Sequence, residues 1–210
     1  MKPYTNDFVT SNNSSSHLRV LVADTILDCN DSGGSGQPVI FLNGAFGSQH
    51  DWKKIRSGLS ADYRIITFDE RARGKSAKSA DYSFEGCLED LSIIITATGI
   101  RRPLLVGWSL GAAIAVWYAA AHTNDVAGLL LIDGAYPIDV LTVAEKEEVR
   151  HTFQKMGPFL PVLAVFGMAA RMSARQAADV NIELHDICGK IGSAYDDIIQ
   201  VNHNCLTNFG

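Results

Sequence analysis

The sequence has few cysteines, no long apolar run and no excess of positive charge. Its four cysteines, Cys29, Cys87, Cys188 and Cys205, are widely separated and form no C-x-x-C pair, which argues against a zinc site and a disulfide framework. The longest apolar stretch, GPFLPVLAVFGMAA (157–170), contains two prolines and is too short to span a membrane. Lys and Arg total 18 against 23 for Asp and Glu, giving a formal charge of -5, so no nucleic-acid footprint is expected. We expect a soluble protein in a reducing, cytoplasmic compartment, with no bound metal.

The composition fits one compact domain. The chain has 210 residues, of which 47% are hydrophobic and 20% are charged, enough for one sizeable core. The first twenty residues are polar and lack the apolar segment of a secretory signal. We expect a disordered polar leader over 1–18, a core over 19–140 and a helical cap over 141–210.

Short apolar runs alternate with amphipathic segments along the core. RVLVADTIL (19–27) alternates and precedes a turn-rich cluster, which predicts the start of an antiparallel hairpin at a sheet edge. The runs 38–44, 63–70, 103–109 and 127–134 are apolar almost throughout, as in strands buried on both faces. Segments with helical spacing lie between them, which predicts an α/β fold with a mostly parallel sheet and helices on both faces. From about Ala144 the pattern is helical without a buried strand.

The stretch LLVGWSLGAAIA (104–115) places Ser109 between Gly107 and Gly111. A G-x-S-x-G motif between a buried strand and a helix forms a turn so tight that the flanking glycines are needed. Such a turn presents the serine hydroxyl at the carboxyl edge of the sheet, where active sites of such sheets lie. We interpret Ser109 as a nucleophile; the alternative is an ordinary strand-to-helix turn that Ser109 caps.

A second segment could supply the backbone hydrogen-bond donors that acyl transfer requires. A serine nucleophile builds a tetrahedral oxyanion that two backbone N–H groups must stabilise. Leu110, directly after the serine, would supply the first donor. The loop NGAFGSQHDW (43–52) would supply the second from Ala45, with Phe46 as the neighbouring candidate. The alternative is a plain glycine-containing loop.

Four segments together resemble the α/β-hydrolase family. They are FLNGAFGSQHDW (41–52) for the oxyanion loop and downstream tryptophan, FDERARGKS (68–76), VGWSLG (106–111) for the nucleophile elbow, and LLLIDGAYP (129–137) for the next strand. Asn43 replaces the usual histidine, and Arg73-Gly74-Lys75 departs from the usual Gly-x-Gly. We interpret Arg71 and Arg73 as forming a loop-bracing salt bridge, with an anion site as the alternative.

The resemblance implies an α/β-hydrolase fold and a cofactor-free serine hydrolase acting on a small-molecule ester, thioester, amide or related carbonyl compound. Ser109 would attack, the amides of Ala45 and Leu110 would hold the oxyanion, and water would release the acyl enzyme. Phe46 and Trp108 would line the substrate pocket, core packing being the other role for Trp108. A serine at the elbow argues against the relatives that open epoxides or displace halide, because those need a carboxylate nucleophile.

The catalytic base has no candidate in its family position. The family order is serine, acid, histidine, and past Pro137 no strand precedes a Gly-x-x-Asp or a late histidine loop. His203 is the best placed base, against a solvent-facing role, and Asp133 is the runner-up acid, against a structural role. The other histidines lie in the leader, at helix ends or in the cap: His17, His50, His122, His151 and His185. We therefore expect a C-terminally truncated family member that lacks the last two strands.

Two other classes of function stay open. One is a non-catalytic or truncated protein of this fold that binds a small apolar ligand, and the other is an acyltransferase or lyase on the same fold. The sequence specifies neither the substrate nor the oligomeric state, because specificity depends on cap residues whose positions it does not give.

Overall fold

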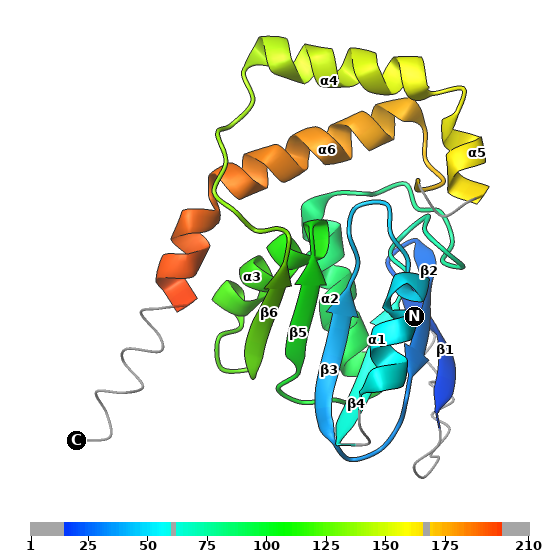
Figure 1. The fold of residues 1–210 in the computed structure, drawn as a ribbon, viewed down its shortest axis with the longest axis vertical. Coiled ribbons are helices and arrows are strands. Elements are labelled where there is room, and N and C mark those ends of the chain that lie inside the picture. The colour runs from blue at the N-terminus through cyan, green and yellow to red at the C-terminus, as the bar shows by residue number, and fades with distance from the viewer. Residues whose placement is uncertain (1–14, 60–61, 166–168, 199–210) are drawn as a thin grey trace, which may run out of the picture.

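A single sheet organises the computed structural model, which describes residues 15–59, 62–165 and 169–198 (Figure 1). Its strands lie in the order β1-β2-β4-β3-β5-β6. Their bounds are β1 (Ser16–Val22), β2 (Thr25–Asp31), β3 (Gln37–Leu42), β4 (Tyr63–Phe68), β5 (Leu104–Trp108) and β6 (Gly128–Ile132). The pairings β1–β2 and β2–β4 are antiparallel, and β4–β3, β3–β5 and β5–β6 are parallel. The predicted mostly parallel sheet is confirmed.

The hairpin at the sheet edge has its turn inside the predicted strand. Ala23 adopts a φ of 36° and Val22 pairs with Thr25, so the run 19–27 divides between β1 and β2. The apolar pattern resumes at Ile26 after only Asp24 and Thr25, so the pattern alone does not reveal the turn. Because β1 begins at Ser16, residues 16–18 belong to the sheet and not to the predicted leader 1–18. Residues 1–14 of that leader lie outside the described residues.

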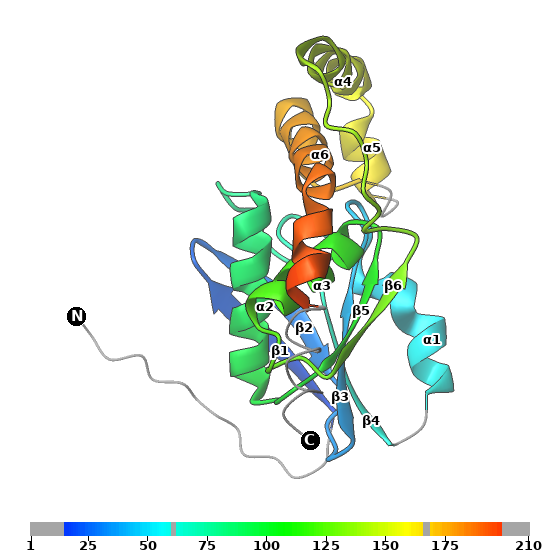
Figure 2. The ribbon, with the colours of Figure 1, turned by 90° about the vertical axis from the view of Figure 1, so that its left-hand side faces the viewer.

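Helices cover both faces of the sheet (Figure 2). On one face lie the 3-10 turn η1 (Gln49–Trp52) and α1 (Lys53–Gly58), where a small buried cluster contains Phe41, Trp52 and Val106. On the other face, α2 (Phe84–Thr98) and α3 (Leu110–Ala121) cover the larger core. Helix α2 begins after Ser83, whose Oγ accepts from the Gly86 N–H, and ends at Gly99 with a φ of 65°, as capping preferences require.

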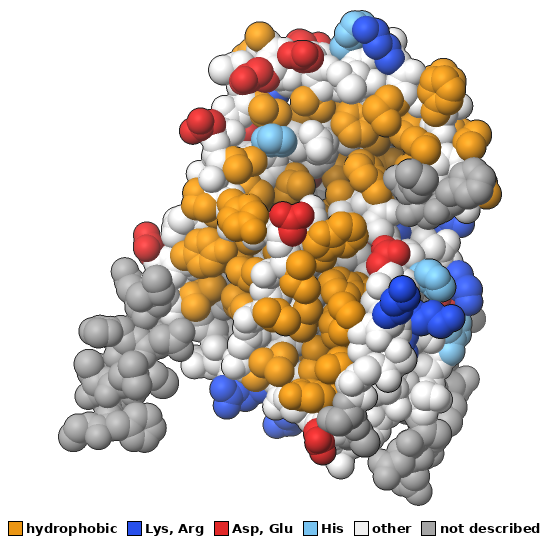
Figure 3. Space-filling view, in the orientation of Figure 1, with side chains coloured by type: hydrophobic (Ala, Val, Ile, Leu, Met, Phe, Trp, Pro, Cys, Tyr) orange, Lys and Arg blue, Asp and Glu red, His pale blue; other side chains and the backbone are white. Residues whose placement is uncertain are grey.

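The sheet has an apolar face near β6. Within the described residues β6 pairs only with β5, and Leu130 and Ile132 are 58% and 36% exposed. Figure 3 shows hydrophobic side chains gathered over β5 and β6. An unpaired edge of this kind, with no charge or proline in the strand, is open to pairing with another strand.

A helical cap follows the sheet and lies over the carboxyl ends of its parallel strands (Figure 1). It contains α4 (Val143–Met156), α5 (Leu160–Val165) and α6 (Ala174–Gly189), and residues 191–198 are also helical. Helix α4 packs along α6, where the Lys146 Nζ lies 2.8 Å from an Asp186 carboxylate oxygen. In the described part of the chain, no helix has both the length and the apolar character needed to cross a bilayer.

Candidate functional site

Ser109 lies at the junction of β5 and α3. Strand β5 ends at Trp108 and α3 begins at Leu110, so Ser109 makes the whole turn with a φ of 52° and a ψ of -114°. This backbone conformation is costly for a residue with a side chain. The side chain forms no capping hydrogen bond, while the backbone N–H donates to the Ile132 carbonyl at 3.0 Å. The half-buried hydroxyl is therefore not committed to holding the turn.

Three glycines allow the backbone to approach itself closely around Ser109. A Cβ at Gly107 would lie 2.3 Å from the Gly111 carbonyl oxygen, and one at Gly111 would lie 2.3 Å from the Leu42 carbonyl oxygen. A Cβ at Gly134 would lie 2.5 Å from the Ser109 carbonyl oxygen. No side chain fits at these distances. Gly107 and Gly111 belong to the sequence motif, whereas Gly134 follows β6 and was missed because its role depends on contact between separate segments.

Asn43 fixes the loop that carries Ala45 and Phe46. Its Nδ2 donates to the Phe68 carbonyl and to a Glu70 carboxylate oxygen, both at 2.8 Å, and its Oδ1 accepts from Trp52 Nε1 at 2.6 Å. All of these groups are buried. Asn43 thus connects β3 to the end of β4 and to η1.

Glu70 and Arg73 support the same loop from the segment after β4. The Asn43 N–H donates to Glu70 Oε1 at 3.2 Å, and Arg73 Nε donates to the Ala45 carbonyl at 2.6 Å. Burial raises the pKa of Glu70, while Arg73 and the Asn43 hydrogen bonds oppose that shift. The Ala45 carbonyl is therefore held by Arg73, which fixes the orientation of the peptide units around the predicted oxyanion donor. The sequence predicted that Arg73 braces a loop, but through a salt bridge; the observed partner is the Ala45 carbonyl, and no local pattern joins the two residues.

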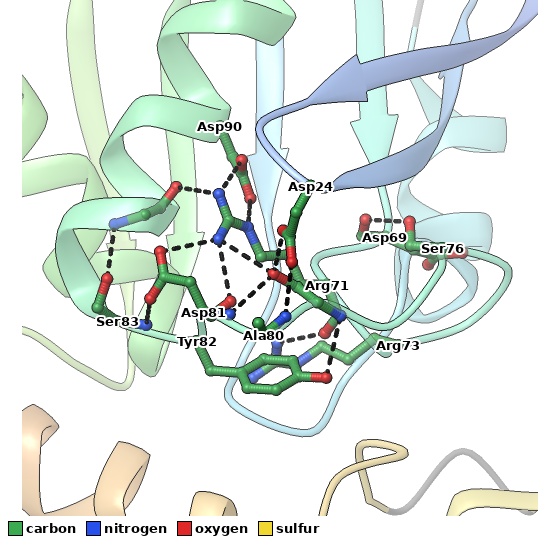
Figure 4. A network of polar contacts seen from close by, with 12 residues as sticks. Asp24, Asp69, Arg71, Arg73, Ser76, Ala80, Asp81, Tyr82, Ser83 and Asp90 are labelled. Atoms are coloured by element: carbon green, nitrogen blue, oxygen red, sulfur yellow. Dashed lines mark hydrogen bonds and ion pairs between the residues drawn. The ribbon is translucent and has the colours of Figure 1, made fainter.

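Arg71 is the centre of a separate ionic network (Figure 4). Its guanidinium binds Asp90 through two nitrogens at 2.7 and 2.8 Å and Asp81 at 2.9 Å. Because Arg71 and Asp90 are both buried, this pair joins the loop between β4 and α2 (69–83, called the β4 loop below) rigidly to α2. The carboxylates occupy the position that a bound anion would take, so Arg71 is a brace. Arg73 forms no ion pair among the described residues and donates to carbonyls instead.

The two predicted pocket residues point to different surroundings. The ring of Trp108 lies against the loop 43–47, since a Cβ at Gly44 would be 3.0 Å from it and one at Gly47 would be 3.3 Å from it. Trp108 is 37% exposed. Phe46 faces the cap, with its ring 6.4 Å from that of Phe153, and lines a cavity of about 600 Å³. Trp108 and Ser109 do not line that cavity.

No histidine of the described residues contacts Ser109 through a hydrogen bond or an ion pair. His17 lies 2.8 Å from Asp28, and the ring of His122 stacks on Tyr118 at 4.4 Å. His50 is in η1, while His151 and His185 are in α4 and α6. The predicted base His203 lies outside the described residues. The predicted acid Asp133 follows β6, is exposed and has a φ of 46°.

The described cysteines are unreactive thiols, although Cys87 lies beside Arg73 and Leu110. Cys29 and Cys188 are buried, Cys87 is partly buried, and all are free thiols. Burial raises the pKa of Cys29 and of Cys87 to about 12, so neither is a thiolate near neutral pH. Within the described ranges, no group of His, Cys, Asp and Glu side chains is arranged to hold a metal ion.

A family model and two curated proteins match this chain over about half of its length or more. Residues 37–161 match a family described as alpha/beta hydrolase fold. Lipase 1 of Psychrobacter immobilis is 31% identical over 121 residues, which are 56% of this chain and 38% of that protein. The sn-1-specific diacylglycerol lipase ABHD11 of Danio rerio is 30% identical over 108 residues, which are 50% of this chain and 34% of that protein. The chain thus aligns with less than half the length of these relatives.

A solved structure shares the fold over most of the chain. The esterase EaEST of Exiguobacterium antarcticum superposes with a TM-score of 0.64 at 23% identity, covering 81% of this chain and 73% of the esterase. At that identity the likeness establishes the fold alone.

Proposed function

Because the chain belongs to the alpha/beta hydrolase fold family, we propose that it is a serine hydrolase that cleaves an ester or related carbonyl compound through an acyl enzyme. The observation that carries the proposal is the turn at Ser109. A serine with a φ of 52° is held there by close backbone contacts at three glycines. Such strain persists only where surrounding structure enforces it, and it clusters at functional sites.

In the proposed reaction, Ser109 Oγ attacks the substrate carbonyl carbon and loses its proton to a base. The N–H groups of Leu110 and Ala45 stabilise the oxyanion, and the leaving alcohol departs as the carbonyl re-forms. Water then attacks the acyl enzyme, releasing the acid and restoring the serine. Leu110 is the first residue of α3, so its N–H also carries the partial positive charge of a helix N-terminus.

The arrangement supports Ala45 as the second donor through Arg73. Oxyanion donors act best when they are already oriented before the reaction. The contact between Arg73 Nε and the Ala45 carbonyl, at 2.6 Å, holds the loop without using its N–H groups. Phe46 is the neighbouring donor on the same loop, and Trp108 covers Gly44 and Gly47 beside it.

Labelling with a fluorophosphonate probe tests the proposal. We expect one modified site, Ser109, no labelling of Ser109→Ala, and unchanged labelling of Ser193→Ala, a matched exposed serine. Equal labelling of Ser109→Ala would overturn the proposal. Hydrolysis of a short-chain nitrophenyl ester, followed in parallel, would distinguish an enzyme from a non-catalytic binder.

The same assay tests the base and the acid. If His203 or Asp133 acts with Ser109, His203→Ala or Asp133→Asn slows labelling by at least about a hundredfold, because general-base assistance contributes roughly that much or more. His151→Ala, a substitution in α4, is the control. An unchanged labelling rate in both variants would mean that neither residue serves Ser109.

A further inference from the structure

A cavity in the described part of the chain lies between the cap and two loops of the core. Its apolar lining includes Phe46, Leu160, Pro161, Ala164 and Met172. Its volume of about 600 Å³ lies within the usual range for small-molecule sites, roughly 300–1,000 Å³. Because Phe46 and Gly47 contribute to its wall, the cavity adjoins the loop that carries Ala45.

Two cationic side chains line the same cavity. Lys78 comes from the β4 loop and Arg171 from the segment before α6. Lys78 has no ion-pair partner in the described part of the chain. The Arg171 backbone N–H donates to the Ala72 carbonyl at 2.9 Å, and its guanidinium donates to the Ser76 carbonyl. Among the described residues, neither side chain forms an ion pair with a carboxylate.

Two carboxylates lie behind the lining, because a Cβ at Gly47 would be 2.9 Å from Asp51 Oδ2 and one at Gly74 would be 2.1 Å from Asp69 Oδ2. Asp51 accepts from the Ser48 N–H at 2.9 Å. Asp69 is buried and accepts from the Gln49 and Lys75 N–H groups, each at 2.8 Å. No Asp or Glu of the described ranges lines the cavity. The cavity lining therefore combines an apolar body with two cationic side chains, while the two carboxylates behind it are held by backbone N–H groups.

We propose that this cavity binds an amphiphilic carboxylate, with the apolar chain against Leu160 and Phe46 and the carboxylate near Lys78 and Arg171. Burial of the chain would supply most of the affinity, and the two cations would select an anionic end over a neutral one. The link to catalysis rests on the proposed function: if Ser109 is the nucleophile, the substrate is an ester whose apolar part carries a free carboxylate. Binding itself requires no reaction at Ser109.

Calorimetric titration of the full chain with decanoate and with 1-decanol tests this inference. We use the Ser109→Ala variant, so that the result does not depend on whether Ser109 is a nucleophile. We expect decanoate to bind at least fivefold more tightly than 1-decanol. Lys78→Gln and Arg171→Gln should each weaken decanoate binding by roughly twofold to fivefold, the size typical of an exposed ion pair. Neither should change the binding of 1-decanol.

Matched variants distinguish binding in the cavity from attraction of the ligand to positive charge elsewhere on the surface. Lys75→Gln and Arg175→Gln remove neighbouring cations that do not line the cavity, and we expect unchanged binding of both ligands. Ala164→Trp fills the cavity and should abolish both, with folding checked by circular dichroism. Equal affinities for the two ligands, equal losses in the control variants, or binding retained in folded Ala164→Trp would each overturn the inference. Labelling of Ser109 without decanoate binding would reject the cavity proposal alone, and the reverse would reject the proposed function alone.

Discussion

Two loops that follow parallel strands are held in contrasting ways. The turn after β5 is held by the backbone: glycines at 107, 111 and 134 let carbonyl groups approach closely, and the Ser109 side chain caps nothing. The loop after β4 is held by side chains: Asp69 and Ser76 bind the backbone of distant segments, and Arg71 binds Asp90 (Figure 4). A loop held by the backbone leaves its side chain free for chemistry, whereas a loop held by side chains supports its neighbours.

The difference also explains where charge is tolerated. Arg71 of the β4 loop binds Asp90 of α2; burial raises the pKa of Asp90 and Arg71 opposes that shift, so each buried charge depends on the other. The turn at Ser109 contains no ionisable side chain between Gly107 and Gly111. Removing one partner should therefore be most costly in the β4 loop, and adding atoms should be most costly at the turn.

Arg71→Gln should cause the largest loss of stability. It leaves the buried Asp90 carboxylate without its cation, and breaking a buried pair costs about 3–5 kcal/mol. Urea unfolding followed by circular dichroism measures the change. Arg175→Gln, at an exposed position, should change the free energy of unfolding by less than about 0.5 kcal/mol. A loss that small for Arg71→Gln would show that the network does not hold the loop.

Gly111→Ala should cause the second largest loss. The new Cβ would lie 2.3 Å from the Leu42 carbonyl oxygen, and this backbone must move to accept it, at a cost of about 2–3 kcal/mol. Gly58→Ala is the matched control, because a Cβ at Gly58 meets nothing within 4 Å and alanine favours a helix. If the two variants had equal unfolding free energies, the close approach of Gly111 to the Leu42 carbonyl would not be what fixes the turn.

The sequence predicted the backbone-held turn better than the side-chain-held loop. Gly107, Ser109 and Gly111 are neighbours in the chain, and the apolar runs around them predicted β5 and α3 directly. The contacts from Arg71 to Asp90 and from Arg73 to Ala45 join positions 19 and 28 residues apart, and nothing in the local pattern names the partner. The same limit applies to Gly134, whose contact with Ser109 arises only from sheet pairing.

The cap shows a second limit of the sequence. Helical spacing predicted helices after about Ala144, and α4, α5 and α6 lie there. Apolar spacing did not predict how these helices lie over the sheet. The cavity beneath α5, and the presence of both Lys78 and Arg171 in its lining, could therefore not be predicted. Phe46 and Trp108 were predicted to share a pocket, yet Trp108 packs on the loop while Phe46 faces the cap.

Ser109→Gly should stabilise the protein by about 1 kcal/mol. Glycine adopts a φ of 52° without steric strain, and the relief of roughly 1–3 kcal/mol exceeds the entropy that glycine loses on folding. Ser109→Ala keeps the Cβ and should leave stability nearly unchanged. Both variants lack the hydroxyl and should lose labelling, so comparison of their urea midpoints separates strain from chemistry. Equal midpoints would mean that Ser109 stores no strain.

Asp24→Asn should have the smallest effect, and one that depends on pH. Asp24 lies in the β1–β2 turn and accepts from the Ala80 N–H at 2.7 Å and from the Ser79 hydroxyl at 2.5 Å. These hydrogen bonds, that from Ala80 first, lower the pKa of Asp24 below its ordinary value of 3.8. A carboxyl group with a lowered folded-state pKa stabilises the fold when ionised, because the unfolded chain binds the proton more readily.

The stability lost in Asp24→Asn should therefore be fully present above pH 3.8, where the carboxylate is ionised in both states. It should disappear as the pH falls through the lower pKa of the folded protein. Urea unfolding of the variant and the parent chain between about pH 7 and pH 2.5 measures the difference. Asp139→Asn, at an exposed position before α4, is the control and should match the parent chain throughout. A difference that grew toward low pH would have the wrong sign for a carboxylate stabilised by hydrogen bonds, and would show that Asp24 does not connect the hairpin to the β4 loop through its charge.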